Sequence, residues 1–219
     1  MTKNGSYVVF FDLDKTLLSI NSGSAMVWEA YKEGLMSTRD LVKAVMLSLM
    51  YKLRLKNPLK AAESMAKWLK GIPETSIIEL SKKLVEEKLI QMIRPSMIQE
   101  IEQHKKKGAN VVILSAALPY ICMPIANYLG IDKVICSAIE TSNGMFTGKP
   151  IGQICLGKEK EVRARQYCFD KSYDIREAYS YGDSYSDRFI LQSTGNPISV
   201  TPDKKLRKLA EMMNWPIME

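Results

Sequence analysis

Short apolar runs alternate with helical patterns over most of the chain. Runs of four to eight apolar residues bounded by polar ones are typical of buried strands, whereas apolar residues spaced three and four positions apart indicate helices. Because helical stretches separate the apolar runs, the pattern predicts an α/β protein with a right-handed, mostly parallel sheet. The expected strands are Tyr7–Phe11, Val111–Leu114, Val134–Cys136, Ala178–Tyr181 and Pro197–Val200, with a β-hairpin at Ile139–Pro150.

One stretch interrupts this alternation. From about Ser22 to Leu89 the apolar residues have helical spacing and show no strand-like alternation. Gly34, Asn57–Pro58 and Gly71–Pro73 divide the stretch into about four expected helices. The expected organisation is a core of residues 1–20 and 90–219 with a helical insertion of residues 21–89.

Acidic and hydroxyl side chains follow three of the expected strands. Asp12 and Asp14 come directly after the first strand, Ser115 after the second, and Asp183 after Ala178–Tyr181 and one glycine. Ligands of parallel α/β sheets collect beyond the carboxyl ends of the strands. Alternation along an extended chain is expected to turn Asp12 and Asp14 to the same side. Caps and turns also favour aspartate, but three such strand ends together predict one polar site.

The order of these groups resembles the four motifs of the haloacid dehalogenase (HAD) superfamily. The segments that carry the likeness are Asp12–Thr16, Ser115, a lysine at 158 or 160, and Gly182–Ser184 with Asp187. The likeness covers nearly the whole chain. Within the superfamily, the chain is most similar to the phosphoserine-phosphatase-like branch, subfamily IB. It implies a Rossmann-like core with an inserted α-helical cap that closes over the site and excludes water.

The resemblance also implies a two-step phosphatase reaction. Asp12 would attack phosphorus and become an aspartyl phosphate, and Asp14 would protonate the leaving oxygen and later activate water. Mg²⁺ would be held by the Asp12 carboxylate, the Asp14 backbone carbonyl and the Asp183 carboxylate. Because the dehalogenases of the family lack an acid at the position of Asp14, this residue favours phosphate chemistry.

Two further residues are expected to support the acidic groups. Asp187, one helical turn after Asp183, would hold a metal-bound water or the site lysine. Thr16 would orient Asp12 by a hydrogen bond, and a role in capping a helix is the alternative for it. These roles, too, are implied by the resemblance.

Phosphate binding is expected to involve Ser115, the amides of Ala116 and Ala117, and one lysine. The two amides lie at an expected helix start, where free N–H groups bind anions, although an ordinary N-cap serine would use the same groups. Lys158 and Lys160 are both candidates for the lysine. The spacing to Asp183, which is similar to that in the phosphoserine-phosphatase-like branch, favours Lys160.

Substrate selection is expected to depend on residues near the insertion. Phosphoserine phosphatases recognise the substrate amino group with an acidic residue there, but the comparable stretch Leu18–Ser22 contains no acid. A buried ammonium without a carboxylate partner is costly, so Glu29 or Glu33 would have to supply one. Asn21 and Ser22 are our candidate substrate-binding residues. The predicted substrate is therefore a small phosphomonoester that the sequence does not identify further.

The composition of the chain argues against several other classes of function. The chain has 219 residues, of which 46% are hydrophobic and 25% charged, as is usual for globular proteins. The net charge of +7 suits anionic partners, but no nucleic-acid recognition motif accompanies the lysine runs, so we expect no nucleic-acid partner. The single histidine, His104, lies beside a lysine run and is expected at the surface. One imidazole argues against a zinc or Ser-His-Asp mechanism.

The expected location is the cytoplasm. The first strand follows the N-terminus too closely for a signal peptide, and the four cysteines lack a CxxC spacing, which favours reduced thiols. The apolar stretch Leu41–Leu55 is too short to span a bilayer. A buried helix is its favoured interpretation, and a helix that rests on a membrane surface, with a lipid phosphate as substrate, is the alternative.

Two other functions stay open at this point. The same fold also suits a phosphotransferase that passes the aspartyl phosphate to an alcohol, and the basic charge also suits a non-catalytic binding protein. The sequence does not define the oligomeric state.

Overall fold

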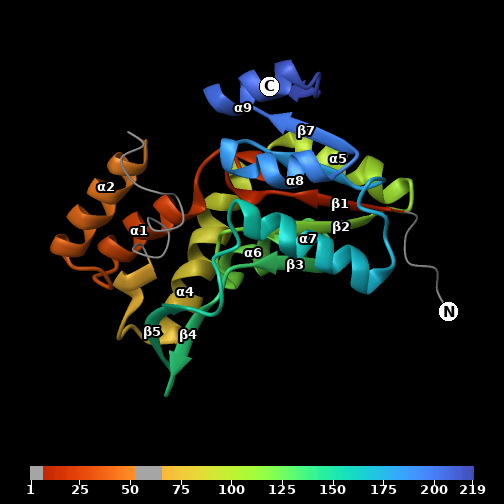
Figure 1. Ribbon diagram of the computed structural model, residues 1–219. Coiled ribbons are helices and arrows are strands. Elements are labelled where there is room, and N and C mark those ends of the chain that lie inside the picture. Colours follow the sequence, from red (N-terminus) through yellow and green to blue (C-terminus); the bar gives the residue numbers. More distant parts are fainter. Residues whose placement is uncertain (1–6, 53–65) are drawn as a thin grey trace.

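A single parallel sheet forms the centre of the molecule (Figure 1). The computed structural model describes residues 7–52 and 66–219. Among these residues, a six-stranded sheet has the order β3-β2-β1-β6-β7-β8, and all of its pairs are parallel. The strands are β1 (Val8–Phe11), β2 (Asn110–Ser115), β3 (Lys133–Cys136), β6 (Tyr179–Gly182), β7 (Asn196–Val200) and β8 (Ile217–Met218). This confirms the expected strands, to which the structure adds β8.

Helices cover both faces of this sheet. Val9 and Phe11 of β1 belong to an apolar cluster with α5 (Pro95–Lys106) and α6 (Pro119–Tyr128). Val8 and Phe10 belong to a second cluster, with α7 (Lys158–Lys171) and α8 (Arg188–Ser193). The C-terminal helix α9 (Lys204–Met212) follows β7. Burial on both faces explains why the strands read as continuous apolar runs, and it leaves the strand ends as the place for polar groups.

The insertion is helical, as expected. The described elements are α1 (Ser22–Lys32), α2 (Thr38–Lys52), the 3₁₀-helix η2 (Lys67–Leu69), α4 (Glu74–Leu84), the π-helical turn η3 (Val85–Leu89) and the 3₁₀ turn η4 (Ile90–Met92). Most of the expected helix around Ala61–Leu69 lies outside the described residues. Buried apolar side chains of α1 and α4 join the same cluster as β1 and α5, so the insertion packs directly on the core.

The hairpin forms where it was expected but lies against the insertion. β4 (Ile139–Ser142) and β5 (Met145–Pro150) pair across the turn Asn143–Gly144, whose residues both have positive φ as a tight hairpin turn requires. The Phe146 amide donates to the Ile72 carbonyl (3.0 Å), and the Glu74 amide donates to the Gly144 carbonyl (2.9 Å). The hairpin, which lies within the expected core by residue range, is therefore hydrogen-bonded to the insertion.

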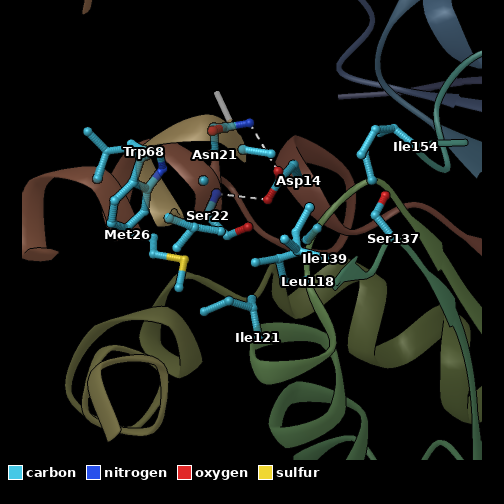
Figure 2. A pocket seen from close by; sticks show the side chains of 16 residues that line it. Asp14, Asn21, Ser22, Met26, Trp68, Leu118, Ile121, Ser137, Ile139 and Ile154 are labelled. Carbon is cyan, nitrogen blue, oxygen red and sulfur yellow. Dashed lines mark hydrogen bonds between the residues drawn. The ribbon is translucent and has the colours of Figure 1, made fainter. Parts of the chain in front are cut away.

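A cavity of about 200 Å³ lies between the insertion and the core (Figure 2). Residues of α1 and η2 line one side, and the start of α6 with Ile139 and Ile154 lines the other. Tyr120 of α6 also donates a hydrogen bond to Glu74 of α4, so polar and apolar contacts both connect the two parts.

Two expectations about single segments are wrong. Over its described part, residues 41–52, the helix expected in Leu41–Leu55 buries one face, because Leu41 and Ala44 of α2 are buried whereas Val42, Val45, Met46 and Leu49 are 49–60% exposed. Residues 53–55 lie outside the described residues. None of the described helices is both long and apolar enough to cross a bilayer.

The second wrong expectation is a surface position for His104, whose side chain is only 4% exposed. Its Nδ1 lies 2.9 Å from the Tyr7 hydroxyl and its Nε2 lies 2.9 Å from the Tyr181 hydroxyl. Burial lowers the pKa of His104, in keeping with a neutral ring that exchanges hydrogen bonds with two tyrosines. The imidazole therefore helps to join α5 to the sheet.

Candidate active site

Asp12 and Asp183 meet at the carboxyl edge of the sheet because β1 and β6 are neighbours. The Asp12 amide donates to the Tyr181 carbonyl (3.0 Å), which ties the residue after β1 to β6. One carboxylate oxygen each of Asp12, Asp183 and Asp187 lie within 4.8 Å of one another. All three side chains are buried. The structure thus gathers acids from two distant parts of the chain into one cluster.

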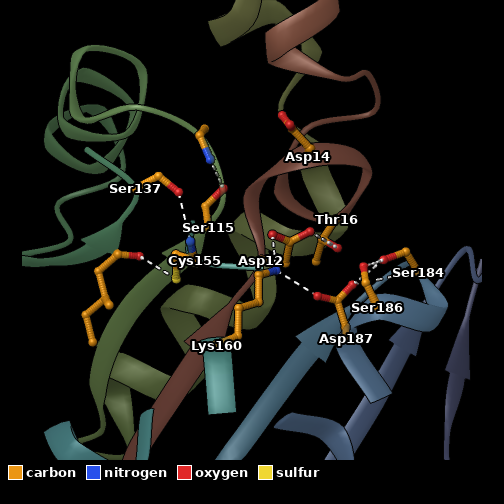
Figure 3. A network of polar contacts seen from close by, with 12 residues as sticks. Asp12, Asp14, Thr16, Ser115, Ser137, Cys155, Lys160, Ser184, Ser186 and Asp187 are labelled. Carbon is orange, nitrogen blue, oxygen red and sulfur yellow. Dashed lines mark hydrogen bonds and ion pairs between the residues drawn. The ribbon is translucent and has the colours of Figure 1, made fainter. Parts of the chain in front are cut away.

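Lys160 lies within this acidic cluster (Figure 3). Its Nζ is 2.6 Å from Asp12 Oδ1 and 2.7 Å from Asp187 Oδ1, and its side chain is 3% exposed. Lys158, two residues earlier on α7, pairs with Glu161 instead, and its side chain is 65% exposed. Side chains two positions apart on a helix point in very different directions. Of the two candidate lysines, only Lys160 therefore contacts Asp12 and Asp187.

The cluster holds more negative than positive charge. Burial raises the pKa of Asp12 to about 7, although Lys160 opposes the rise and Asp187 adds to it. Burial, followed by repulsion from Asp12 and Asp187, raises the pKa of Asp183 to about 8. Burial alone would lower the pKa of Lys160, but the two acids outweigh it and hold the lysine charged. Three acids against one ammonium leave the site short of positive charge.

This imbalance and the donor atoms fit a divalent cation. The set is made only of carboxylate oxygens, which Mg²⁺ prefers to nitrogen or sulfur ligands. A cation next to Asp12 and Asp183 would supply the missing charge and lower both raised pKa values. The residues present therefore fit the magnesium site that the resemblance implies.

Asp187 is fixed by the segment that precedes it. Its Oδ2 accepts hydrogen bonds from the Ser184 amide (3.2 Å) and the Ser184 hydroxyl (2.8 Å). A Cβ on Gly182 would lie 2.8 Å from the Asp187 Cβ, closer than such atoms approach in proteins. Glycine at 182 is therefore what lets Asp187 approach the end of β6. Thr16 is fully buried and donates to Asp12 Oδ2 at 3.5 Å, a long contact.

Asp14 lies apart from this cluster. Its Oδ1 accepts from the Ser22 amide (2.8 Å) and its Oδ2 accepts from the Asn21 side-chain amide (3.0 Å). Burial raises the pKa of the Asp14 carboxyl, and the hydrogen bonds with Ser22 oppose the rise without cancelling it. We expected Asp12 and Asp14 to point to the same side, as in an extended strand. This expectation is wrong, because the chain leaves the strand after Asp12 and residues 13–17 form a tight turn in which Lys15 has a φ of 60°. Asn21 and Ser22, our candidate substrate-binding residues, thus contact Asp14 and also line the cavity.

Ser115 ends β2 and is buried, but no helix begins directly after it. The expected helix start at Ala116–Ala117 is wrong, because α6 begins at Pro119 after an extended Leu118. The Ser115 hydroxyl accepts a hydrogen bond from the Ala117 amide (3.1 Å). Phosphate binding by Ser115 and Ala116 stays a prediction.

Comparison with known proteins identifies the class of this protein. Residues 9–192 match the model of the haloacid dehalogenase-like hydrolase family, and the chain belongs to this family. It is therefore a hydrolase by family, which confirms the resemblance seen in the four motifs.

Particular relatives cover nearly the whole chain. It is 30% identical over 215 residues to the inhibition of morphological differentiation protein of Streptomyces azureus, an alignment that spans 96% of this chain and 77% of that protein. It is 26% identical over 221 residues to a histidinol-phosphatase of Neisseria meningitidis serogroup C, spanning 96% and 97%. The structure of a substrate-bound phosphoserine phosphatase complex aligns with a TM-score of 0.74, 16% identity and coverage of 97% and 92%. This last likeness confirms the expected α/β fold.

Proposed function

We propose that this protein is a Mg²⁺-dependent phosphatase that hydrolyses a small phosphomonoester through an aspartyl-phosphate intermediate. The observation that carries the proposal is the contact of Lys160 with both Asp12 and Asp187 beside Asp183. A buried carboxylate that is paired with an ammonium and lies beside further acids suits attack on phosphorus, in which an aspartate forms a covalent phosphate. The similarity to a protein named histidinol-phosphatase supports phosphate-ester hydrolysis.

In this proposal each acid has a separate role. Asp12 attacks phosphorus and takes the phosphoryl group, while Lys160 offsets the charge of Asp12 and of the phosphate oxygens. Asp14 protonates the leaving oxygen, and its raised pKa favours the protonated form that this step needs. It then deprotonates the water that hydrolyses the intermediate. The separation of Asp14 from the Asp12 cluster suits this division, because the attacking and leaving oxygens lie on opposite sides of phosphorus.

The metal in this proposal is held by the carboxylates of Asp12 and Asp183, with the Asp14 carbonyl as a third protein ligand. When bound, Mg²⁺ supplies positive charge to the phosphate and to the attacking carboxylate. Asp187 holds Lys160 in place, and Thr16 steadies Asp12. Ser115 and the Ala116 amide bind phosphate oxygens at the end of β2.

The helical insertion, residues 21–89, acts as a cap on the core of residues 1–20 and 90–219. Its contacts with the hairpin β4–β5 and with α6 keep it closed over the cavity. A closed cap keeps water away from the leaving group.

A screen of phosphate esters with Mg²⁺ and with EDTA tests the function. We expect turnover of at least one ester among amino-acid, sugar, nucleotide and lipid phosphates, and loss of this turnover in EDTA. No turnover of any ester would overturn the proposal in favour of a non-catalytic basic protein. Adding a short alcohol to the assay detects the phosphotransferase alternative, because the phosphorylated alcohol would then accumulate.

The variant Asp12→Asn tests the nucleophile. We expect kcat to fall by about a thousandfold or more, since an amide does not form the acyl phosphate. The exposed Asp132→Asn is the matched control and should retain wild-type activity. Circular dichroism and thermal melting check that both variants fold. Full activity of Asp12→Asn would reject Asp12 as the nucleophile.

A specific observation bears on the lipid-surface alternative. The exposed stripe of α2, defined as Val42, Val45, Met46 and Leu49, has the spacing of one helix face, and the exposed Arg39 and Lys43 lie on the same helix. An apolar stripe with basic residues beside it suits the surface of an anionic bilayer. We therefore include docking of α2 on anionic lipid in the proposal.

A further inference from the structure

The cavity between the insertion and the core begins at Asp14 (Figure 2). In the proposed reaction Asp14 protonates the leaving oxygen, so the alcohol attached to that oxygen must extend away from Asp14. This cavity is the space that the structure provides there. Its volume of about 200 Å³ is somewhat larger than a cavity of roughly 150 Å³ that holds one benzene ring.

The walls of the cavity are apolar. Met26, Val27, Trp68 and Leu69 line it from the insertion, and Leu118, Ile121, Ile139 and Ile154 line it from the core. Asp14 is the one charged side chain among the described residues that line it. Such walls stabilise a hydrocarbon group. They give no counter-ion to a carboxylate, and Asp14 alone could pair with an ammonium.

Asp14, Asn21 and Ser137, three of the four polar side chains on the lining, already have partners within the protein, whereas the buried Ser22 hydroxyl has none. The Asn21 side chain donates to Asp14 and accepts from the Ser24 amide (2.8 Å). The Ser137 hydroxyl accepts from the Cys155 amide (3.0 Å). Asp14 itself accepts two hydrogen bonds. A ligand with several hydroxyl or charged groups would have to break these bonds, whereas an apolar ligand would not.

We propose that this cavity binds the leaving-group alcohol of the substrate and selects an uncharged, apolar one the size of an aromatic ring or a short alkyl chain. The inference rests on the proposed phosphatase function and names its substrate class. It excludes the amino-acid phosphates as preferred substrates.

Four esters of primary alcohols test this inference: ethyl, n-butyl and 2-phenylethyl phosphate, and phosphoethanolamine. Their alcohols are all primary, so differences in kcat/KM report mainly on binding of the alcohol. We expect kcat/KM for 2-phenylethyl phosphate to exceed that for ethyl phosphate by at least about tenfold. We expect kcat/KM for phosphoethanolamine to fall about tenfold below that for ethyl phosphate, because Asp14, which already accepts two hydrogen bonds, is the one acid on the described lining that could pair with its ammonium.

Matched tryptophan variants connect this preference to the cavity. Trp68→Ala removes part of the cavity wall. It should lower the ratio of kcat/KM for 2-phenylethyl phosphate to kcat/KM for ethyl phosphate by about tenfold. Trp28→Ala alters a tryptophan of α1 that is 52% exposed and does not line the cavity, and should leave the ratio unchanged. Val27→Asp places a carboxylate in the wall and should raise kcat/KM for phosphoethanolamine relative to ethyl phosphate. If thermal melting shows that Val27→Asp is not folded, the comparison of Trp68→Ala with Trp28→Ala tests the inference instead.

The outcomes separate this inference from the function on which it rests. Equal kcat/KM values across the four esters, or a preference for phosphoethanolamine, would overturn the inference and leave the phosphatase function intact. An equal loss of the ratio in Trp68→Ala and Trp28→Ala would also overturn it. No turnover of any phosphate ester with Mg²⁺ would overturn both.

Discussion

At the scale of single residues, Lys160 holds the charges of the candidate site together. It is the ammonium that contacts Asp12 and Asp187, and it is buried with them. Removing one partner from a buried ion cluster is costly, because the remaining charges stay desolvated without compensation. Lys158 offers a natural comparison, since it has the same side chain on the same helix but pairs with Glu161 at the surface.

We therefore predict different effects for Lys160→Met and Lys158→Met. Lys160→Met should lower the free energy of unfolding by about 3 kcal/mol, whereas Lys158→Met should change it by less than about 1 kcal/mol. Without its lysine Asp12 loses the charge that lowers its pKa, so the acidic limb of the kcat/KM profile should move to higher pH in Lys160→Met. Urea denaturation and pH profiles measure the two effects. Equal destabilisation by the two changes would contradict the assignment of Lys160 to the site.

The residues that the sequence predicted well are those that sit directly at strand ends. Asp12, Ser115 and Asp183 follow apolar runs that pair side by side, so pattern alone predicted that they would meet at one edge. The orientation of Asp14 was not predictable in this way, because it depends on a positive φ at Lys15. The burial of His104 did have a signal, namely its spacing from Met97 and Ile101 on the buried face of α5.

At the scale of whole elements, local patterns predicted which segments form but not where they pack. The Asn143–Gly144 turn identified the hairpin, whereas its contacts with Ile72 and Glu74 join parts of the chain about seventy residues apart. β8 was missed because two residues, Ile217 and Met218, are too short to show a pattern. Helix α2 was expected to be buried from its overall apolarity, but hydrophobicity alone does not say which side of a helix meets the core.

The exposed stripe of α2 leads to a prediction about lipid binding. We expect the protein to sediment with vesicles that contain anionic lipid and to bind neutral vesicles more weakly, because basic residues accompany the apolar ones. The double variant Val42→Ser/Met46→Ser should weaken this binding by about tenfold. The control Val162→Ser/Met212→Ser makes the same changes at sites on α7 and α9 that are 49% and 71% exposed, and should bind like wild type. No sedimentation with either kind of vesicle would eliminate surface docking.

At the scale of the whole molecule, the buried acids connect stability to pH. The pKa of Asp12 rises from 3.8 to about 7 on folding, and that of Asp183 rises from 3.8 to about 8. Between these values the folded state holds protons that the unfolded state has released. Linkage then requires that the metal-free protein lose stability as the pH rises from about 4 to about 8. Above this range both states have released these protons, and the contribution of the two acids becomes constant.

Mg²⁺ should reverse this trend, since it binds the deprotonated carboxylates of the folded state. A free Mg²⁺ concentration of about one hundred times Kd stabilises a protein by about 2.7 kcal/mol, which corresponds to a rise in Tm of about 8 °C for a chain of this size. We predict that this rise is near its full value at pH 8.5 and much smaller at pH 6, where protons compete for Asp12 and Asp183. Thermal melting in EDTA and in Mg²⁺ at the two pH values measures it. Asp183→Asn should abolish most of the rise, whereas Asp132→Asn should leave it unchanged. Because Asp12 and Asp183 have pKa values of about 7 and about 8, a cation that binds to them must compete with protons at pH 6. A rise in Tm that is equal at both pH values would therefore show that the cation binds elsewhere.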